Sequence, residues 1–372
     1  MDKSNTFKKR NSQIEILRII SIIAIVLSHA CYHSDSYIYN TGFYQIYSLI
    51  LIPLGKLFFC VFSVISCWYL TEYKFKSKKF FLLWFQTIFY NIVLLFFAIF
   101  YFKDDVSFTT IVKSFLPILG FGTSHGYIAG YLGFLLILPL EIIVLKKISV
   151  NGGIVITICT YFLNMFLSLN YVTNILTEIL FFTNLFALTC IIKKIKILDK
   201  IRKYNICYLL VAIICFFISV TGWILKIKYD NIIGKIIAKF LINDERCIIN
   251  IIFGFSIFLF FLNLKPFSNK VINLISGCTL DILLIHDTKI IRNHIWNEIF
   301  NVSSYYNEKF ILWSITVMFL IIFIAFIIYV FRKYVLERLV FKLRIIKKIC
   351  FHIDYFYENE IENYQKDKKN NN

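Results

Sequence analysis

Arg18 and His29 are the two side chains in the first apolar segment, Ile14 to Ala30, with the clearest capacity for chemistry. Each is the only residue of its type in that segment, and eleven positions separate them. Eleven residues make close to three helical turns, so both side chains project from one helix face, about 16 Å apart along the axis. Because ionisable groups are costly in hydrocarbon, the pair predicts a polar track through a membrane.

The two side chains suit different tasks. The planar guanidinium of Arg18 can hold a phosphate or carboxylate that arrives from the cytosol. The imidazole of His29 can take a proton from a hydroxyl near neutral pH. Purely structural roles also fit: Arg18 as a snorkelling anchor or a partner of Glu15, and His29 as an interfacial aromatic residue.

A late apolar segment, SGCTLDILLIHDTKIIRNHIW, carries the next candidates. His286 lies about as far along this segment as His29 does along the first, so both histidines could line one site. The alternative is an interfacial pair of His286 with Asp287. Asp281 is the one acid well inside the segment and suggests a polar cavity. His125, just before the fourth apolar run, is alone more often a loop histidine.

Other catalytic signatures are missing from the sequence. It contains no phosphate-binding glycine loop and no HExxH, and the ten cysteines occur singly. A metal site is therefore not expected. The cysteines are expected to pack as small hydrophobic residues.

The elements that position these residues are long apolar runs. Of the 372 residues, 59% are hydrophobic and only 17% are charged, against about 25% in a soluble domain. Runs long enough to cross a bilayer predict an all-α polytopic membrane protein with about ten spans. They cover about 14–33, 49–70, 80–102, 128–145, 152–169, 171–192, 206–225, 247–264, 271–291 and 311–331.

The net charge of +18 follows the membrane topology rather than a nucleic-acid footprint. With the N-terminus in the cytoplasm, 28 of the 40 lysines and arginines fall in inner loops and the C-terminal tail. This pattern predicts a multi-pass cell-membrane protein with both termini cytoplasmic and basic loops facing anionic lipid. We expect one membrane domain over 1–335, then a basic and finally polar tail over 336–372 that is partly disordered.

Several motifs together resemble acyltransferase family 3, the integral-membrane O-acyltransferases that modify cell-surface glycans. IEILRIISIIAIVLSHA is similar to that family's first helix, with Arg18 and His29 at the matching positions. FFCVFSVISCWYL is similar to its second helix and keeps Ser66, with Cys67 where glycine is usual. The following loop, KFKSKKFF, has lysines including Lys79, without the family's arginine.

Two later motifs extend the resemblance over roughly 1–335. The element near the fourth span keeps Tyr127 and lacks the usual tryptophan. The late motif keeps four family positions and has Asp281 in place of glycine; the four are Thr279, Ile282, Leu284 and His286. Ten spans is also the family's usual number.

The resemblance implies transfer of an acyl group, most simply acetyl, from cytosolic acetyl-CoA or another acyl-CoA to a hydroxyl of a cell-surface or lipid-linked glycan. It implies no permanently bound cofactor, and as partners the lipid bilayer and glycan-assembly machinery, but no nucleic acid. His29 and His286 would be catalytic, and Arg18 and Lys79 would bind the donor. Further side chains would line the site: Ser66, Tyr127, Asp281 and His125.

A glycan or lipid transporter or flippase without acyl-transfer chemistry is the main alternative. It predicts internal symmetry and helix-breaking glycine or proline pairs at mid-membrane, and neither is evident. A polysaccharide polymerase would need a large outer loop rich in arginine. A membrane scaffold would leave Arg18 and His29 unexplained.

The topology is directly testable. We expect cysteine labelling or tag fusions to place the N-terminus, the 193–203 cluster and the C-terminus in the cytoplasm, and the 226–246 loop outside. The physical reason is the excess of lysine and arginine on the inner side. An external C-terminus would contradict an even number of spans and the similar depth of His29 and His286.

Overall fold

A computed structural model describes residues 10–71, 76–119, 126–169, 174–195, 204–228 and 246–370. These residues form helices joined by turns, and no strand occurs among them. Four expectations fall outside these ranges: His125, most of the 193–203 cluster, most of the 226–246 loop, and the basic residues before Arg10.

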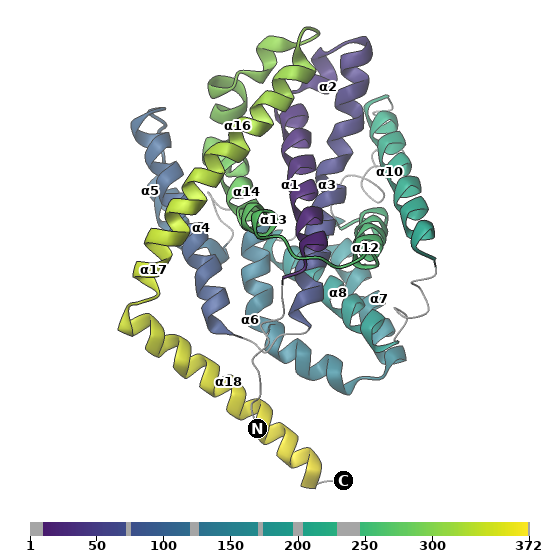
Figure 1. The fold of residues 1–372 in the computed structure, drawn as a ribbon, viewed down its shortest axis with the longest axis vertical. Coiled ribbons are helices and arrows are strands. Elements are labelled where there is room, and N and C mark those ends of the chain that lie inside the picture. The colour runs from purple at the N-terminus through teal and green to yellow at the C-terminus, as the bar shows by residue number, and fades with distance from the viewer. Residues whose placement is uncertain are drawn as a thin grey trace. The chain divides into compact units, whose positions relative to one another are not determined.

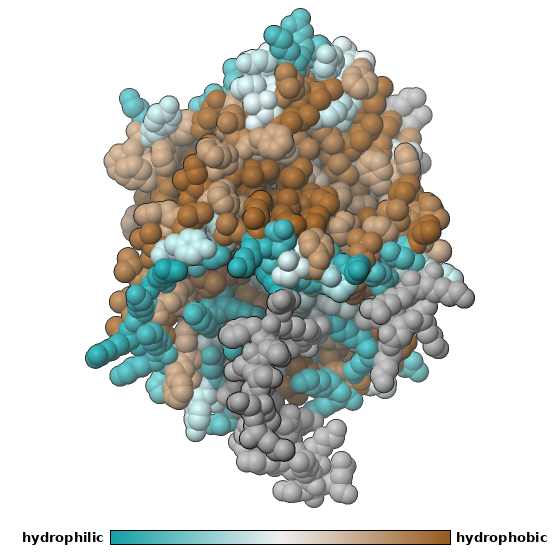
Figure 2. All heavy atoms as spheres, viewed as in Figure 1, coloured by the Kyte–Doolittle hydropathy of each residue, from teal (hydrophilic) through white to brown (hydrophobic). Residues whose placement is uncertain are grey.

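Eight helices in the described ranges are long and apolar enough to cross a membrane. Figure 2 shows large areas of hydrophobic residues on the molecular surface, as lipid-facing helices require. The all-helical class is thereby confirmed for the described residues, and their long apolar helices are compatible with a multi-span membrane protein. The eight helices, most of them labelled in Figure 1, are α1 (Ser12–His33), α3 (Gly42–Leu70), α4 (Ser77–Phe100), α6 (Gly126–Lys147), α7 (Val150–Leu169), α8 (Asn174–Lys194), α10 (Asn205–Lys228) and α16 (Phe310–Phe331).

The predicted eighth and ninth spans differ from expectation. α12 (Ile248–Leu262) has 15 residues, about 22 Å of helix, which is short of a hydrocarbon core of about 30 Å. The ninth run is broken into α13 (Lys270–Ser276), α14 (Thr279–Asp287) and α15 (Lys289–Asn293), with a bend of 69° after Asp287. The described residues therefore support eight spans, or nine if the bent pair counts as one.

The remaining elements are short, except at the C-terminal end. They are α2 (Ser36–Tyr39), α5 (Phe108–Ser114), η1 (Pro117–Leu119), the π-helix η3 (His294–Ile299), η4 (Val302–Tyr305), the π-helix η5 (Arg332–Leu336) and α17 (Glu337–Val340). The tail, expected to be partly disordered, is helical in α18 (Arg344–Asn370). Contacts with α4 hold it: the Asp354 carboxylate accepts from the Ser77 backbone N–H at 2.7 Å.

The chain divides into two compact units, each assembled from separated segments. Unit 1 comprises 1–66, 196–286 and 293–326, and therefore contains α1, α10, α12, α13, most of α3 and the first part of α16. Unit 2 comprises 67–195, 287–292 and 327–372, with α4 to α8 and α18. The single membrane domain expected over 1–335 stays a prediction.

Small residues set the helix packing of unit 1. The Ser28 hydroxyl on α1 donates to the Ile52 carbonyl on α3 at 2.6 Å. A Cβ added to Gly55 would lie 2.4 Å from the Ser28 hydroxyl oxygen, and one on Gly254 of α12 would lie 3.0 Å from the sulfur of Cys60. Close backbone approach at small residues is the usual means of packing helices in lipid.

In unit 2, α8 packs against both α6 and α7. The Asn184 amide donates to the Thr157 carbonyl on α7 at 2.7 Å. On the α6 side, a Cβ on Gly130 would lie 2.2 Å from Cβ of Glu178 and 3.1 Å from its carbonyl carbon. Lys194 donates to the Leu145 carbonyl near the C-terminal end of α6, where a cation is favoured by the helix dipole.

We predict that Gly130→Ala destabilises unit 2 by about 1–3 kcal/mol, the usual cost of overpacking. The added methyl meets the backbone of Glu178, which cannot move without shifting α8. Gly133→Ala is the matched control, because its Cβ would meet the flexible tip of Ile179. The measurement is the apparent melting temperature of each purified variant in detergent. Equal melting temperatures for Gly130→Ala and wild type would contradict this packing.

Candidate functional site

The structure brings His29 and His286 together within unit 1. Nδ1 of His29, near the C-terminal end of α1, lies 3.1 Å from Nε2 of His286 on α14. His286 is 0% exposed, whereas His29 is partly exposed. The His286 ring is therefore enclosed in the protein interior, whereas part of the His29 ring is accessible.

Hydrogen bonding sets the tautomers of the pair. Nδ1 of His286 lies 2.5 Å from the Ile282 carbonyl, which can only accept, so this nitrogen carries the hydrogen. With both rings neutral, Nε2 of His286 must accept from Nδ1–H of His29. The lone pair of His29 then resides on Nε2. A base whose ring is oriented by a second group is a recurring catalytic arrangement.

His33 and Trp296 complete a cluster of four rings around this pair. The His29 centroid lies 5.1 Å from that of His33 and 5.2 Å from that of His286. The indole of Trp296 stacks on His33 at 6.5 Å and meets His286 edge-on at 6.0 Å. The Asn297 amide lies 3.4 Å from the His33 carbonyl, within hydrogen-bond reach, which links η3 to the end of α1.

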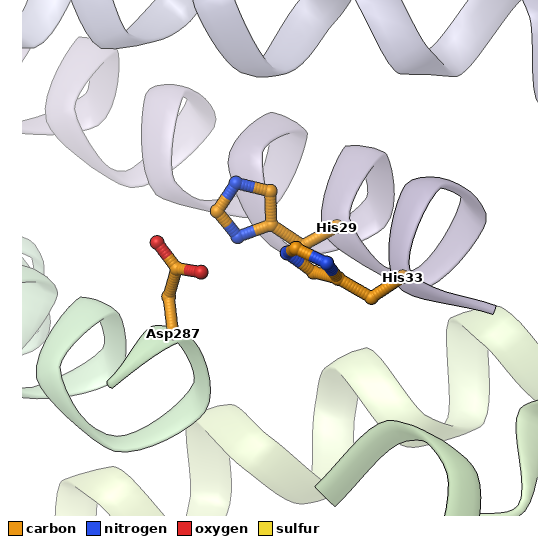
Figure 3. A group of neighbouring side chains, drawn as sticks. All are labelled: His29, His33 and Asp287. Atoms are coloured by element: carbon orange, nitrogen blue, oxygen red, sulfur yellow. The ribbon is translucent and has the colours of Figure 1, made fainter. Parts of the chain in front are cut away.

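α1 ends at His33, so His29 and His33 lie one turn apart and project from one side of the helix (Figure 3). Their ligand nitrogens lie within 4.8 Å of each other. The two imidazoles could therefore supply two nitrogen ligands to one transition-metal ion. Asp287, which Figure 3 also draws, belongs to unit 2, where it pairs with Arg292 at 2.7 Å.

Arg18 lies toward the other end of α1, beside a buried carboxylate that has a closer partner. Glu15 accepts from Arg10 at 2.6 and 2.7 Å, and the Ser276 hydroxyl also donates to it. Arg18 comes no nearer to Glu15 than 3.9 Å. Nε of Arg18 is buried, and none of the residues that the structure describes forms a hydrogen bond with it. The contact with Glu15 therefore does not supply an acceptor for the Nε–H of Arg18.

The other predicted residues of unit 1 lie apart from the ring cluster or inside the helix packing. The Ser66 hydroxyl donates to the Phe62 carbonyl of its own helix at 3.1 Å. Because α3 runs antiparallel to α1, Ser66 lies about 21 Å beyond Ile52 and nearer the Arg18 end. Asp281 is 1% exposed on α14.

Two predicted residues belong to unit 2. Lys79 is exposed near the start of α4. Tyr127, at the start of α6, lies in an aromatic cluster, with its ring 5.4 Å from Phe182 and 6.5 Å from Tyr131.

Sequence reasoning missed Trp296 and Arg332. Both are buried in π-helices, a geometry that occurs frequently at functional sites. Arg332 pairs with Glu337, which also accepts from Gln86 at 3.1 Å. Arg332 appeared in the sequence as one of many basic tail residues. Trp296 had no signal beyond its position ten residues after His286.

Comparison with protein-family models, with curated proteins and with solved structures finds no match for this chain.

Proposed function

We propose that the protein is a membrane O-acyltransferase that moves an acyl group, most simply acetyl, from a cytosolic acyl-CoA to a hydroxyl of a cell-surface or lipid-linked glycan. The observation that carries this proposal is the hydrogen bond between His29 and His286. It orients a partly exposed imidazole with its lone pair on Nε2, as a general base for a hydroxyl requires.

The positions of Arg18 and His29 on α1 support two separate roles on one helix, binding of the acyl donor and proton transfer. The Nε–H of Arg18 has no hydrogen-bond partner among the described residues, and a guanidinium with an unused donor suits an anionic acyl donor such as the phosphates of acyl-CoA. His29 is about 16 Å away along the axis, a distance that the extended pantetheine arm of coenzyme A can cover.

In the proposed reaction, the glycan hydroxyl oxygen attacks the thioester carbonyl carbon while Nε2 of His29 takes the hydroxyl proton. The new C–O bond forms, the C–S bond then breaks, and the proton passes from His29 to the departing thiolate. His286 keeps the ring of His29 in place and stabilises the imidazolium by accepting from Nδ1–H.

A transporter or flippase for glycans or lipids is the second candidate. The observation in its favour is the division of the chain into two compact units, since alternating access moves one bundle against another. Mass spectrometry of surface glycans from cells with and without the gene separates the two. Loss of one acyl mass per residue supports the transferase, while unchanged acylation with less exported glycan supports the transporter.

His29→Ala should abolish acyl transfer and leave the amount of protein in the membrane unchanged. Losing one general base typically lowers the rate by about 10²–10⁴-fold. The assay is transfer of a radiolabelled acetyl group from acetyl-CoA to endogenous glycans in isolated membranes. His352→Ala, on the exposed surface of α18, is the control. Near-normal transfer by His29→Ala would rule out this role.

Arg18→Lys should raise the apparent KM for acetyl-CoA strongly, with little change in membrane abundance. Lysine reaches the same region but lacks the planar two-pronged donor geometry, and weakening the ground state and the transition state equally raises KM. Initial rates across a range of acetyl-CoA concentrations measure this. Lys56→Arg offers a comparison at a helical cation outside the proposed track. Wild-type kinetics for Arg18→Lys would contradict donor binding by Arg18 and would indicate that it only anchors the helix.

A further inference from the structure

Trp296 holds an unusual position in the ring cluster. Its side chain is 0% exposed, and its ring contacts both His33 and His286, the same two imidazoles that His29 contacts. His29 and Trp296 therefore contact the same two histidines, His33 and His286. The π-helix η3 places the indole there after the chain has turned by 69° beyond Asp287.

The indole N–H of Trp296 is buried and has no hydrogen-bond partner in the described residues. An indole nitrogen can only donate, so nothing but an acceptor can satisfy it. Buried donors in proteins are nearly always paired, and one that is not calls for an explanation such as a ligand. Trp313, in the same unit, shows the usual case: its N–H donates to the Phe300 carbonyl at 2.8 Å.

We propose that Trp296 is a further catalytic residue, whose Nε1–H donates to the oxygen of the thioester carbonyl during acyl transfer. This inference rests on the proposed function. When the glycan hydroxyl attacks the carbonyl carbon, the C=O π electrons move onto the carbonyl oxygen, and His29 takes the hydroxyl proton. The buried indole N–H stabilises that oxyanion until the C–S bond breaks, the C=O bond re-forms and the thiolate takes the proton from His29.

The environment suits this role. His33 and His286 pack against the indole on two sides, and the His294–Glu298 contact at 2.7 Å lies within the same π-helix. The donor is therefore held in place before the reaction, and a preorganised donor in a site that excludes water contributes most to stabilising an oxyanion.

The test replaces Trp296 with β-(3-benzothienyl)alanine, which keeps the shape of the ring system and puts sulfur in place of N–H. We expect kcat for acetyl transfer in isolated membranes to fall by about 10²–10³-fold, the usual effect of losing one oxyanion donor, with KM for acetyl-CoA unchanged. The same replacement at Trp313 is the matched control and should leave kcat near the wild-type value.

Trp296→Phe serves as a second variant that also lacks the donor, should the first accumulate poorly. A kcat within about threefold of wild type in either variant, with the wild-type enzyme active, would overturn the role of Trp296 and leave the proposed function standing. A lowered melting temperature with unchanged kcat would show a packing role instead. No acetyl transfer by the wild-type protein would overturn the proposed function, and this inference with it.

Discussion

Lipid offers no hydrogen-bond partners, so polar side chains near both ends of α1 pair with other helices inside the protein, and this constraint organises unit 1. Near its N-terminal end, the Ser12 hydroxyl donates to the Asn273 side chain at 2.9 Å, and Glu15 accepts from Ser276. Near the C-terminal end, His29 pairs with His286. The two ends of one apolar helix thus fix α13 and α14 beside it.

The break in the segment from Lys270 to Tyr305 follows from the same constraint. If the helix continued straight past Asp287, Trp296 would lie farther along its axis, away from His286. Instead α14 ends just after His286, the chain bends by 69°, and η3 returns Trp296 to the imidazoles of His33 and His286. Irregular helix at membrane depth is tolerated where it is buried in protein, and here it gathers rings from three separate stretches of chain.

The proposed chemistry uses two consequences of burial. His286 is fully buried, so its hydrogen bonds set both tautomers without competition from water. Trp296 is equally buried, so its unpaired N–H is a strong donor to any oxygen that reaches it. At the other end of α1, Glu15 accepts from Arg10 at 2.6 Å, whereas Arg18 comes no nearer to Glu15 than 3.9 Å.

The sequence by itself determined the helical class, most spans and the shared face of Arg18 and His29, because apolar run length and the 3.6-residue repeat are local properties. Equal depth along two apolar runs was also enough to suggest that His29 and His286 meet. Tertiary structure alone decided the break after Asp287, the tautomers of the pair and the place of Trp296. Those features depend on which buried groups find partners across helices, and no local pattern records that choice.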